Sequence, residues 1–169
     1  MSPIITNNNF YASSFLFGKF IKIFILKIMN NTIIKFGYPS TLIKEYKYWV
    51  VLLREKQITI GSLVIICKEE KKSVSTISYA AFSELQNVFI FVEKLLKNEF
   101  NADKINYLTL MMIDPHVHTH VIPRYSSLLK FNSKDYLDAN WPAPPIINKY
   151  ISLSDEDFVS LLERIKYAI

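Results

Sequence analysis

The chain has 169 residues, of which 50% are apolar and 21% are charged. This length and balance exclude a disordered chain and predict a single folded domain with a core of its own. The formal net charge is +5, but residues 1–28 supply +3 of it through three lysines without any acid. The remaining chain holds 17 basic and 15 acidic side chains. Because this part is nearly balanced, we expect no nucleic-acid polymer as a partner.

Residues 1–28 differ in composition from the rest of the chain. A start that contains asparagine and serine is followed by an apolar run that Lys19, Lys22 and Lys27 interrupt. A membrane-spanning helix needs ~20 apolar residues in a row, and a secretory signal needs a different order of charges and a cleavage site. We therefore interpret the segment as an atypical extension of one domain over residues 29–169, and we expect no membrane partner. A helix lying on a membrane surface is the alternative.

The single cysteine, Cys67, cannot form an internal disulfide. It follows the apolar run at residues 63–66, which favours a buried packing residue over a nucleophile. A lone cysteine also fits a reducing compartment, so we expect a cytoplasmic protein.

The first half of the domain contains predicted strands and one long helix. Runs rich in β-branched and aromatic residues predict strands over residues 32–36, 41–53 and 63–68, separated by turn-forming and charged residues. Ser78 can cap a helix that continues to about Asn98, because apolar side chains recur there at spacings of three and four. This helix is expected to cover one face of a sheet.

The second half begins with a predicted strand over residues 107–112, a tight turn and a return strand. The prolines beside Trp141 predict an irregular segment over residues 126–150. Trp141 could close over a nucleobase, but packing of its loop on the edge of the sheet is the favoured interpretation. Ser154 and Asp157 form a capping-box pattern that predicts a C-terminal helix.

All three histidines of the chain lie within residues 116–120. On an extended strand His116, His118 and His120 share one face, because successive side chains alternate between the two faces. Imidazole titrates near neutral pH, so three of them on one face can attack, donate protons and accept protons.

Three interpretations of these histidines compete. A zinc site would need further ligands, and Asp114 is the only nearby acid. A solvated strand face is the second interpretation. The third is nucleophilic catalysis on a phosphorus ester or anhydride, in which one imidazole attacks and its neighbours bind phosphoryl oxygens or protonate the departing group. We favour the third, since three histidines alternate strictly and none lies elsewhere.

The stretch His-Val-His-Thr-His-Val-Ile-Pro-Arg at residues 116–124 resembles the signature of the histidine triad (HIT) superfamily of nucleotidyl hydrolases and transferases. Residues 61–68 resemble the family's strand that begins with Gly-His and ends in Lys. The order of strand pair, long helix, strand and triad strand is also similar, and the resemblance covers roughly residues 29–124. The sequence around the triad, Asp-Pro-His-Val-His-x-His-Val-Ile-Pro-Arg-Tyr, resembles that of a bacterial-type subgroup.

The resemblance implies an α+β fold with an antiparallel sheet of about five strands, one long helix packed on it and a C-terminal helix. It also implies a homodimer, a nucleotide-type small-molecule substrate and chemistry that needs neither a metal nor another cofactor.

The resemblance implies roles by position. His118 would attack the α-phosphorus of a nucleotide and form a nucleotidyl-histidine intermediate that water then resolves. His116 would help to hold the orientation of the site, and a peptide carbonyl of that turn would fix the tautomer of His118. His120 would contact the phosphoryl oxygens and assist the leaving group. We expect three further residues to bind substrate: Asn106, Ser62 and Arg124.

The chain departs from the family pattern at three places. Ser62 stands where the family often has a histidine, and Arg54 stands where an acid commonly contacts the ribose hydroxyls. Residues 111–115 replace a longer glycine-rich loop; within them Pro115 has no N–H for a phosphate, and Asp114 adds negative charge. We therefore expect a remodelled nucleoside pocket. The alternative to a hydrolase is a nucleotide-binding or dimeric interaction protein with weak or lost catalysis.

Overall fold

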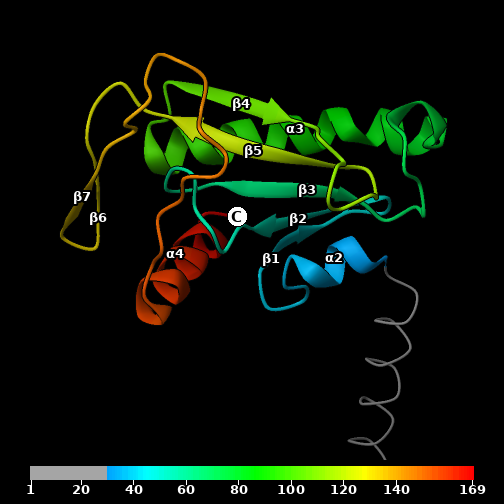
Figure 1. Ribbon diagram of the computed structural model, residues 1–169. Helices are drawn as coiled ribbons and strands as arrows, with labels where there is room; N and C mark the ends of the chain where they lie inside the picture. The colour runs from blue at the N-terminus through cyan, green and yellow to red at the C-terminus, as the bar shows by residue number, and fades with distance from the viewer. Residues whose placement is uncertain (1–29) are drawn as a thin grey trace, which may run out of the picture.

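The computed structural model describes residues 30–169, so the extension over residues 1–28 lies outside the described part of the chain. Its centre is a five-stranded antiparallel sheet in the order β1-β2-β3-β5-β4 (Figure 1). The strands are β1 (Leu42–Glu45), β2 (Trp49–Leu53), β3 (Leu63–Cys67), β4 (Lys104–Leu108) and β5 (His118–Arg124). The helices are α2 (Asn31–Lys35), α3 (Tyr79–Phe100) and α4 (Asp155–Tyr167), and β6 (Leu129–Phe131) and β7 (Lys134–Tyr136) form a separate hairpin. The predicted α+β class with its antiparallel sheet and long helix is confirmed.

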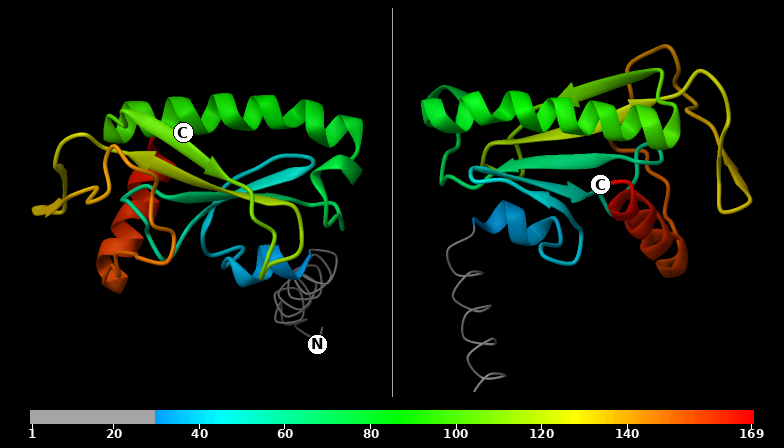
Figure 2. Two further views of the ribbon diagram at one scale, coloured as in Figure 1. Left: turned by 45° about the horizontal axis from the view of Figure 1, so that its top comes forward. Right: turned by 180° about the vertical axis from the view of Figure 1, so that it is seen from behind.

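Helix α3 covers one face of the sheet, and α2 lies on the opposite face (Figure 2). The predicted cap begins α3, because the Ser78 side chain accepts a hydrogen bond from the Ala81 N–H at 3.1 Å. Asn101 ends it in the left-handed conformation, with φ at 50°. The buried face of the helix packs on alternate residues of the strands, including Val51, Ile65 and Val121.

The segment predicted as a strand over residues 32–36 is instead the short helix α2. Asn30 causes this difference: its side-chain oxygen accepts from the Ile33 N–H at 3.1 Å, and its amide donates to the Cys67 carbonyl at 2.8 Å. Ile33 is fully buried against the face of the sheet opposite α3, in a cluster with Val50, Leu52, Val64 and Ile66. Capping and burial therefore override the strand preference of the β-branched residues.

Other boundaries also differ from the prediction. The single strand expected over residues 41–53 is the hairpin β1–β2, closed by a hydrogen bond from the Tyr46 N–H to the Trp49 carbonyl at 2.8 Å. The strand expected over residues 107–112 is β4, which begins and ends earlier in the chain. The segment 126–150 contains the β6–β7 hairpin, whose turn residues Asn132 and Ser133 have positive φ angles.

The C-terminal helix α4 begins where Ser154 accepts a hydrogen bond from the Asp157 N–H at 3.2 Å. The Asp157 carboxylate accepts from Asn132 at 2.9 Å and from Lys134 at 2.5 Å, so it also holds the β6–β7 hairpin against α4. Leu161 and Ile165 are fully buried in the main core cluster. None of the helices within residues 30–169 is long and apolar enough to span a membrane.

Candidate active site

Strand β5 places His118 and His120 on the same face of the sheet. In the antiparallel pairing His118 lies opposite Ile66 and His120 opposite Val64, and both of these residues belong to the apolar cluster under α2. The two imidazole rings are perpendicular, with their centroids 5.1 Å apart. The predicted alternation therefore holds for these two histidines.

His116 is not part of this pair, because β5 begins only at His118. Its ring is held on both sides: Nδ1 lies 3.0 Å from the Thr32 hydroxyl of α2, and Nε2 lies 2.8 Å from the Glu70 carboxylate. A carboxylate accepts, so Nε2 donates to Glu70, and in the neutral ring Nδ1 accepts from Thr32. The side chain is buried and anchors the turn before β5 to α2 and to the loop after β3.

The ring of His118 is held in one tautomer by the main chain. Its Nδ1 lies 2.8 Å from the His116 carbonyl oxygen, which can only accept a hydrogen bond. Nδ1 therefore carries the proton, and the neutral ring keeps a lone pair on Nε2. The resemblance to the HIT signature implies that a peptide carbonyl of this turn fixes the tautomer of His118. In the structure that carbonyl belongs to His116.

His120 is held in its neutral form. Burial, together with the electrostatic effects of His118 and Arg54, lowers the pKa of His120 from 6.5 to about 4, against a smaller opposing effect of Asp114. Its Nδ1 atom is buried and has no hydrogen-bond partner among residues 30–169. At neutral pH this imidazole is therefore a poor proton donor.

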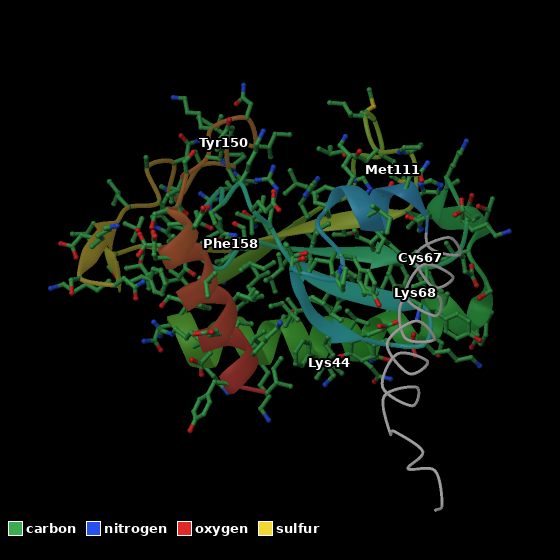
Figure 3. All side chains as sticks on the ribbon, turned by 90° about the horizontal axis from the view of Figure 1, so that it is seen from below. Lys44, Cys67, Lys68, Met111, Tyr150 and Phe158 are labelled. Carbon is green, nitrogen blue, oxygen red and sulfur yellow. The ribbon has the colours of Figure 1, made fainter. Side chains whose placement is uncertain are left out.

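His118 and His120 line a cavity of about 610 Å³ on the α2 side of the sheet. Figure 3 looks onto this side and shows the loops that carry Met111 and Tyr150 beside α2. Six apolar side chains line the cavity: Phe36, Leu110, Met111, Met112, Ile113 and Ile147. The ring centroid of Phe36 lies 5.7 Å from that of each of the two histidines. The cavity can therefore bury a flat, apolar portion of a ligand beside the histidines.

Five charged residues also line the cavity: Lys35, Arg54, Glu55, Lys56 and Asp114. Lys35 donates to Asp114 at 2.5 Å, so these two charges form an ion pair. Arg54 has no carboxylate partner within the part of the chain that the structure describes. The negative charge expected at Asp114 is thus balanced by a lysine, and an arginine remains near the histidines.

The three residues expected to bind substrate lie outside the cavity lining. Ser62 is fully buried; its hydroxyl donates to the Thr59 carbonyl at 2.6 Å and accepts from the Thr59 N–H at 3.1 Å. Its side chain therefore serves the turn that precedes β3.

Arg124 and Asn106 bind each other farther along β5 than His118 and His120, on the same face of the sheet. The Arg124 Nη1 donates to Asn106 Oδ1 at 2.8 Å, and its Nε donates to Asp138 at 2.6 Å. Both side chains of the Arg124–Asp138 pair are almost fully buried. A buried guanidinium needs this counter-ion, so Arg124 makes structural contacts. Asn106 is held in the same network by its hydrogen bond to Arg124.

Trp141 also lies outside the cavity, and its ring centroid is 6.0 Å from the Arg124 guanidinium. Its loop packs against the β4–β5 edge of the sheet through the hydrogen bond from Arg124 to the Ala143 carbonyl at 2.9 Å. The same segment reaches the cavity farther along, at Ile147 and Asn148.

Residues from α2 and the loop after β3 were missed by the sequence analysis: Thr32, Lys35, Phe36 and Glu70. The sequence pattern predicts a strand over residues 32–36 and a charged connection at Glu70, and neither places a side chain at the histidines. The Asn30 cap three residues before Ile33 is the one signal in the sequence that favours a helix there.

The zinc site considered for the histidines has no set of ligands within the described residues. Within residues 30–169 no three side chains of the histidine, cysteine, aspartate and glutamate types are grouped as a metal site would need. Cys67 lies fully buried in the main core, where burial raises the pKa of its thiol to about 11.

A family model for the HIT domain matches residues 35–127, more than half of the chain. The chain belongs to the HIT family. No curated protein matches it, whereas many solved structures do.

Three solved structures illustrate the likeness of this HIT-family protein to known folds. A histidine triad protein from Sinorhizobium meliloti is 21% identical, with a TM-score of 0.65, and the match covers 83% of this chain and 96% of that one. A hypothetical histidine triad nucleotide-binding protein from Sulfolobus tokodaii is 20% identical, with a TM-score of 0.61 and coverage of 81% and 88%. The diadenosine triphosphate hydrolase of Plasmodium falciparum is 17% identical, with a TM-score of 0.56 and coverage of 76% of each chain. These similarities establish a shared fold.

The buried ion pair of Arg124 provides a test of its structural role. Asp138→Ala leaves the Arg124 guanidinium buried without its carboxylate, so the free energy of unfolding should fall by about 3–5 kcal/mol. Chemical denaturation measures this loss. Asp135→Ala removes an exposed carboxylate from the neighbouring hairpin and should change stability by less than about 0.5 kcal/mol. Equal effects of the two variants would contradict the buried pairing.

The lowered pKa of His120 predicts a dependence of stability on pH. Because the folded protein holds this pKa at about 4 against an ordinary 6.5, the unfolded chain binds the proton more readily between these values. The free energy of unfolding should therefore decrease as the pH falls from about 6.5 to 4. Denaturation curves across this range check it, and His120→Gln should show a smaller decrease than the parent. An identical decrease in both proteins would refute the assignment.

Proposed function

We propose that this HIT-family protein is a nucleotidyl hydrolase or transferase that acts on a nucleoside phosphoester, phosphoramidate or polyphosphate through a nucleotidyl-histidine intermediate. The observation that supports it most directly is the hydrogen bond from His118 Nδ1 to the His116 carbonyl. A nucleophilic imidazole needs its second nitrogen held in this way so that the attacking nitrogen keeps its lone pair. The cavity beside His118 is large enough for a nucleotide.

The reaction proceeds in two displacements. His118 Nε2 attacks the α-phosphorus; a P–N bond forms while the bond from phosphorus to the leaving group breaks, and the leaving group keeps the electron pair. Water then attacks the same phosphorus, the P–N bond breaks with its electrons returning to His118, and a nucleoside monophosphate and a proton are released. An alcohol or phosphate in place of water makes the protein a transferase.

The other two histidines have different tasks in this proposal. His116 is a positioning residue, because its ring is tied to Thr32 and Glu70 while its carbonyl holds His118. His120 faces the reacting phosphoryl group as a neutral imidazole. Two of the similar structures carry names that fit such chemistry: one is called a nucleotide-binding protein and the other a diadenosine triphosphate hydrolase. The buried lone cysteine fits a reducing compartment, so we place the protein in the cytoplasm.

Intact mass spectrometry tests the intermediate. Mixing the protein with adenosine and guanosine substrates at mildly alkaline pH should add one nucleotide mass, and acid treatment should remove it, because a phosphoramidate on histidine is acid-labile. His118→Ala should form no adduct and lose at least about 1,000-fold in turnover, since it lacks the nucleophile. Turnover by His118→Ala at the parental rate would refute the proposal. Nucleotide binding without adduct or product in the parent would favour a binding protein with lost catalysis.

We further propose that two copies of the chain form a homodimer through α3 and the edge strand β4. The outer face of α3 exposes large apolar side chains, Tyr79, Phe82 and Ile90, beside a shallow hollow of about 300 Å³. Within residues 30–169, β4 is the last strand of the sheet, and its outer edge can pair with a second copy. An apolar helix face adjoining an open strand edge is a surface that a twofold interface can bury.

Light scattering at several protein concentrations checks the dimer. The parent should have twice the mass of one chain, and Ile90→Asp should shift it to the monomer because a carboxylate would be buried at the interface. Val159→Asp makes the same kind of change at an exposed position of α4 and should leave the dimer intact. A monomeric parent at all concentrations would overturn this proposal.

A further inference from the structure

Arg54 occupies an unusual position beside the proposed reaction centre. It directly follows β2, lines the same cavity as His118 and His120, and lies close enough to His120 for its charge to lower that pKa. Its Nε atom is fully buried without any hydrogen-bond partner among residues 30–169. Burial also lowers the pKa of the Arg54 guanidinium itself, which means that this charge is poorly solvated.

Among the residues that the structure describes, the other cations that line the cavity have partners, whereas Arg54 has no negatively charged partner. Lys35 is paired with Asp114, and the Lys56 ammonium lies 5.0 Å from the Tyr150 ring centroid. Within residues 30–169, the one acceptor of the Arg54 side chain is the neutral Lys56 carbonyl, which Nη1 contacts. Glu55 lines the cavity as well but forms no ion pair with Arg54 in the described chain. A partly buried arginine without a counter-ion is destabilising unless a ligand supplies the negative charge.

The neighbouring His120 limits which leaving group the site can assist. An amine or alkoxide needs a proton as it departs, and a neutral imidazole does not supply one at neutral pH. A phosphate leaves as an anion that is already stable, so it needs a fixed positive charge. Arginine provides that charge together with two parallel donors for phosphate oxygens.

We propose that Arg54 binds the phosphate that departs when His118 attacks, so that the cavity is suited to phosphoric anhydrides rather than to phosphoramidates. This inference rests on the proposed function and names the substrate class of the same site. In the step concerned, the P–N bond to His118 forms, the bridging P–O bond breaks, and its electron pair stays on the oxygen of the leaving phosphate. Arg54 donates hydrogen bonds to that phosphate and transfers no proton.

Two substrates with the same nucleoside distinguish this role from a general one: diadenosine triphosphate, which loses a phosphate-terminated group, and adenosine 5′-phosphoramidate, which loses ammonia. Arg54→Gln should lower kcat/KM for the first by about 10- to 100-fold and for the second by less than about threefold. Arg54→Lys keeps the charge but loses the paired donors, so a smaller loss confined to the anhydride is expected. Arg164→Gln removes an arginine charge on α4, outside the cavity lining, and serves as the control.

The outcomes separate the inference from the proposed function. Equal losses on both substrates would overturn it, because Arg54 would then serve the attacked phosphoryl group, and so would the absence of any loss. Thermal melting shows whether Arg54→Gln is folded; if it is not, Arg54→Lys decides by its selectivity for the anhydride. Binding of pyrophosphate alone, measured by calorimetry, should weaken at least about tenfold in Arg54→Gln. If the parent turns over neither substrate, the proposed function fails, while an unchanged affinity for pyrophosphate would reject Arg54 as the phosphate site.

Discussion

The hydrogen bond between the His118 ring and the His116 carbonyl is the contact on which the rest of the site depends. It defines which ring nitrogen carries the proton and therefore which one can react. The carbonyl is itself held in place, because the His116 side chain is anchored by Thr32 and Glu70 on its two sides. The turn before β5 is thus a rigid support for one imidazole. The alternation of β5 then places His120 beside it on the same face of the sheet.

The charge states of His120, Asp114 and Arg54 determine which ligands the cavity can bind. Burial keeps His120 neutral, and Lys35 compensates the charge of Asp114. Arg54, which follows β2, has no carboxylate partner within residues 30–169 and keeps its charge beside the apolar part of the cavity wall. Such a site favours a ligand that is flat and apolar at one end and negatively charged at the other. A nucleotide combines these two properties, so the residues that line the cavity are consistent with the proposed function.

Local sequence patterns predict those helices and strands whose formation depends on residues close together in the sequence. Ser78 and the apolar spacing after it predict α3, and the alternation around His118 predicts β5. Contacts between distant residues could not be predicted in the same way. The helix α2 needs the bond from Asn30 to the Cys67 carbonyl, 37 positions away, and without that contact its β-branched residues favour a strand. The role of Arg124 likewise depends on a carboxylate, Asp138, in a segment that the sequence describes only as irregular.

Helix α2 has only five residues, and a helix of that length does not persist by itself in water. Its stability comes from Ile33, which inserts into the apolar cluster of β2 and β3. Thr32 and Phe36 sit on the same turn and reach His116 and the two facing imidazoles. Undocking of this single turn would therefore release the anchor of one histidine and uncover the other two at once. Core packing and the geometry of the reactive face form one cooperative unit here, although the segments that build it are some eighty positions apart in the chain.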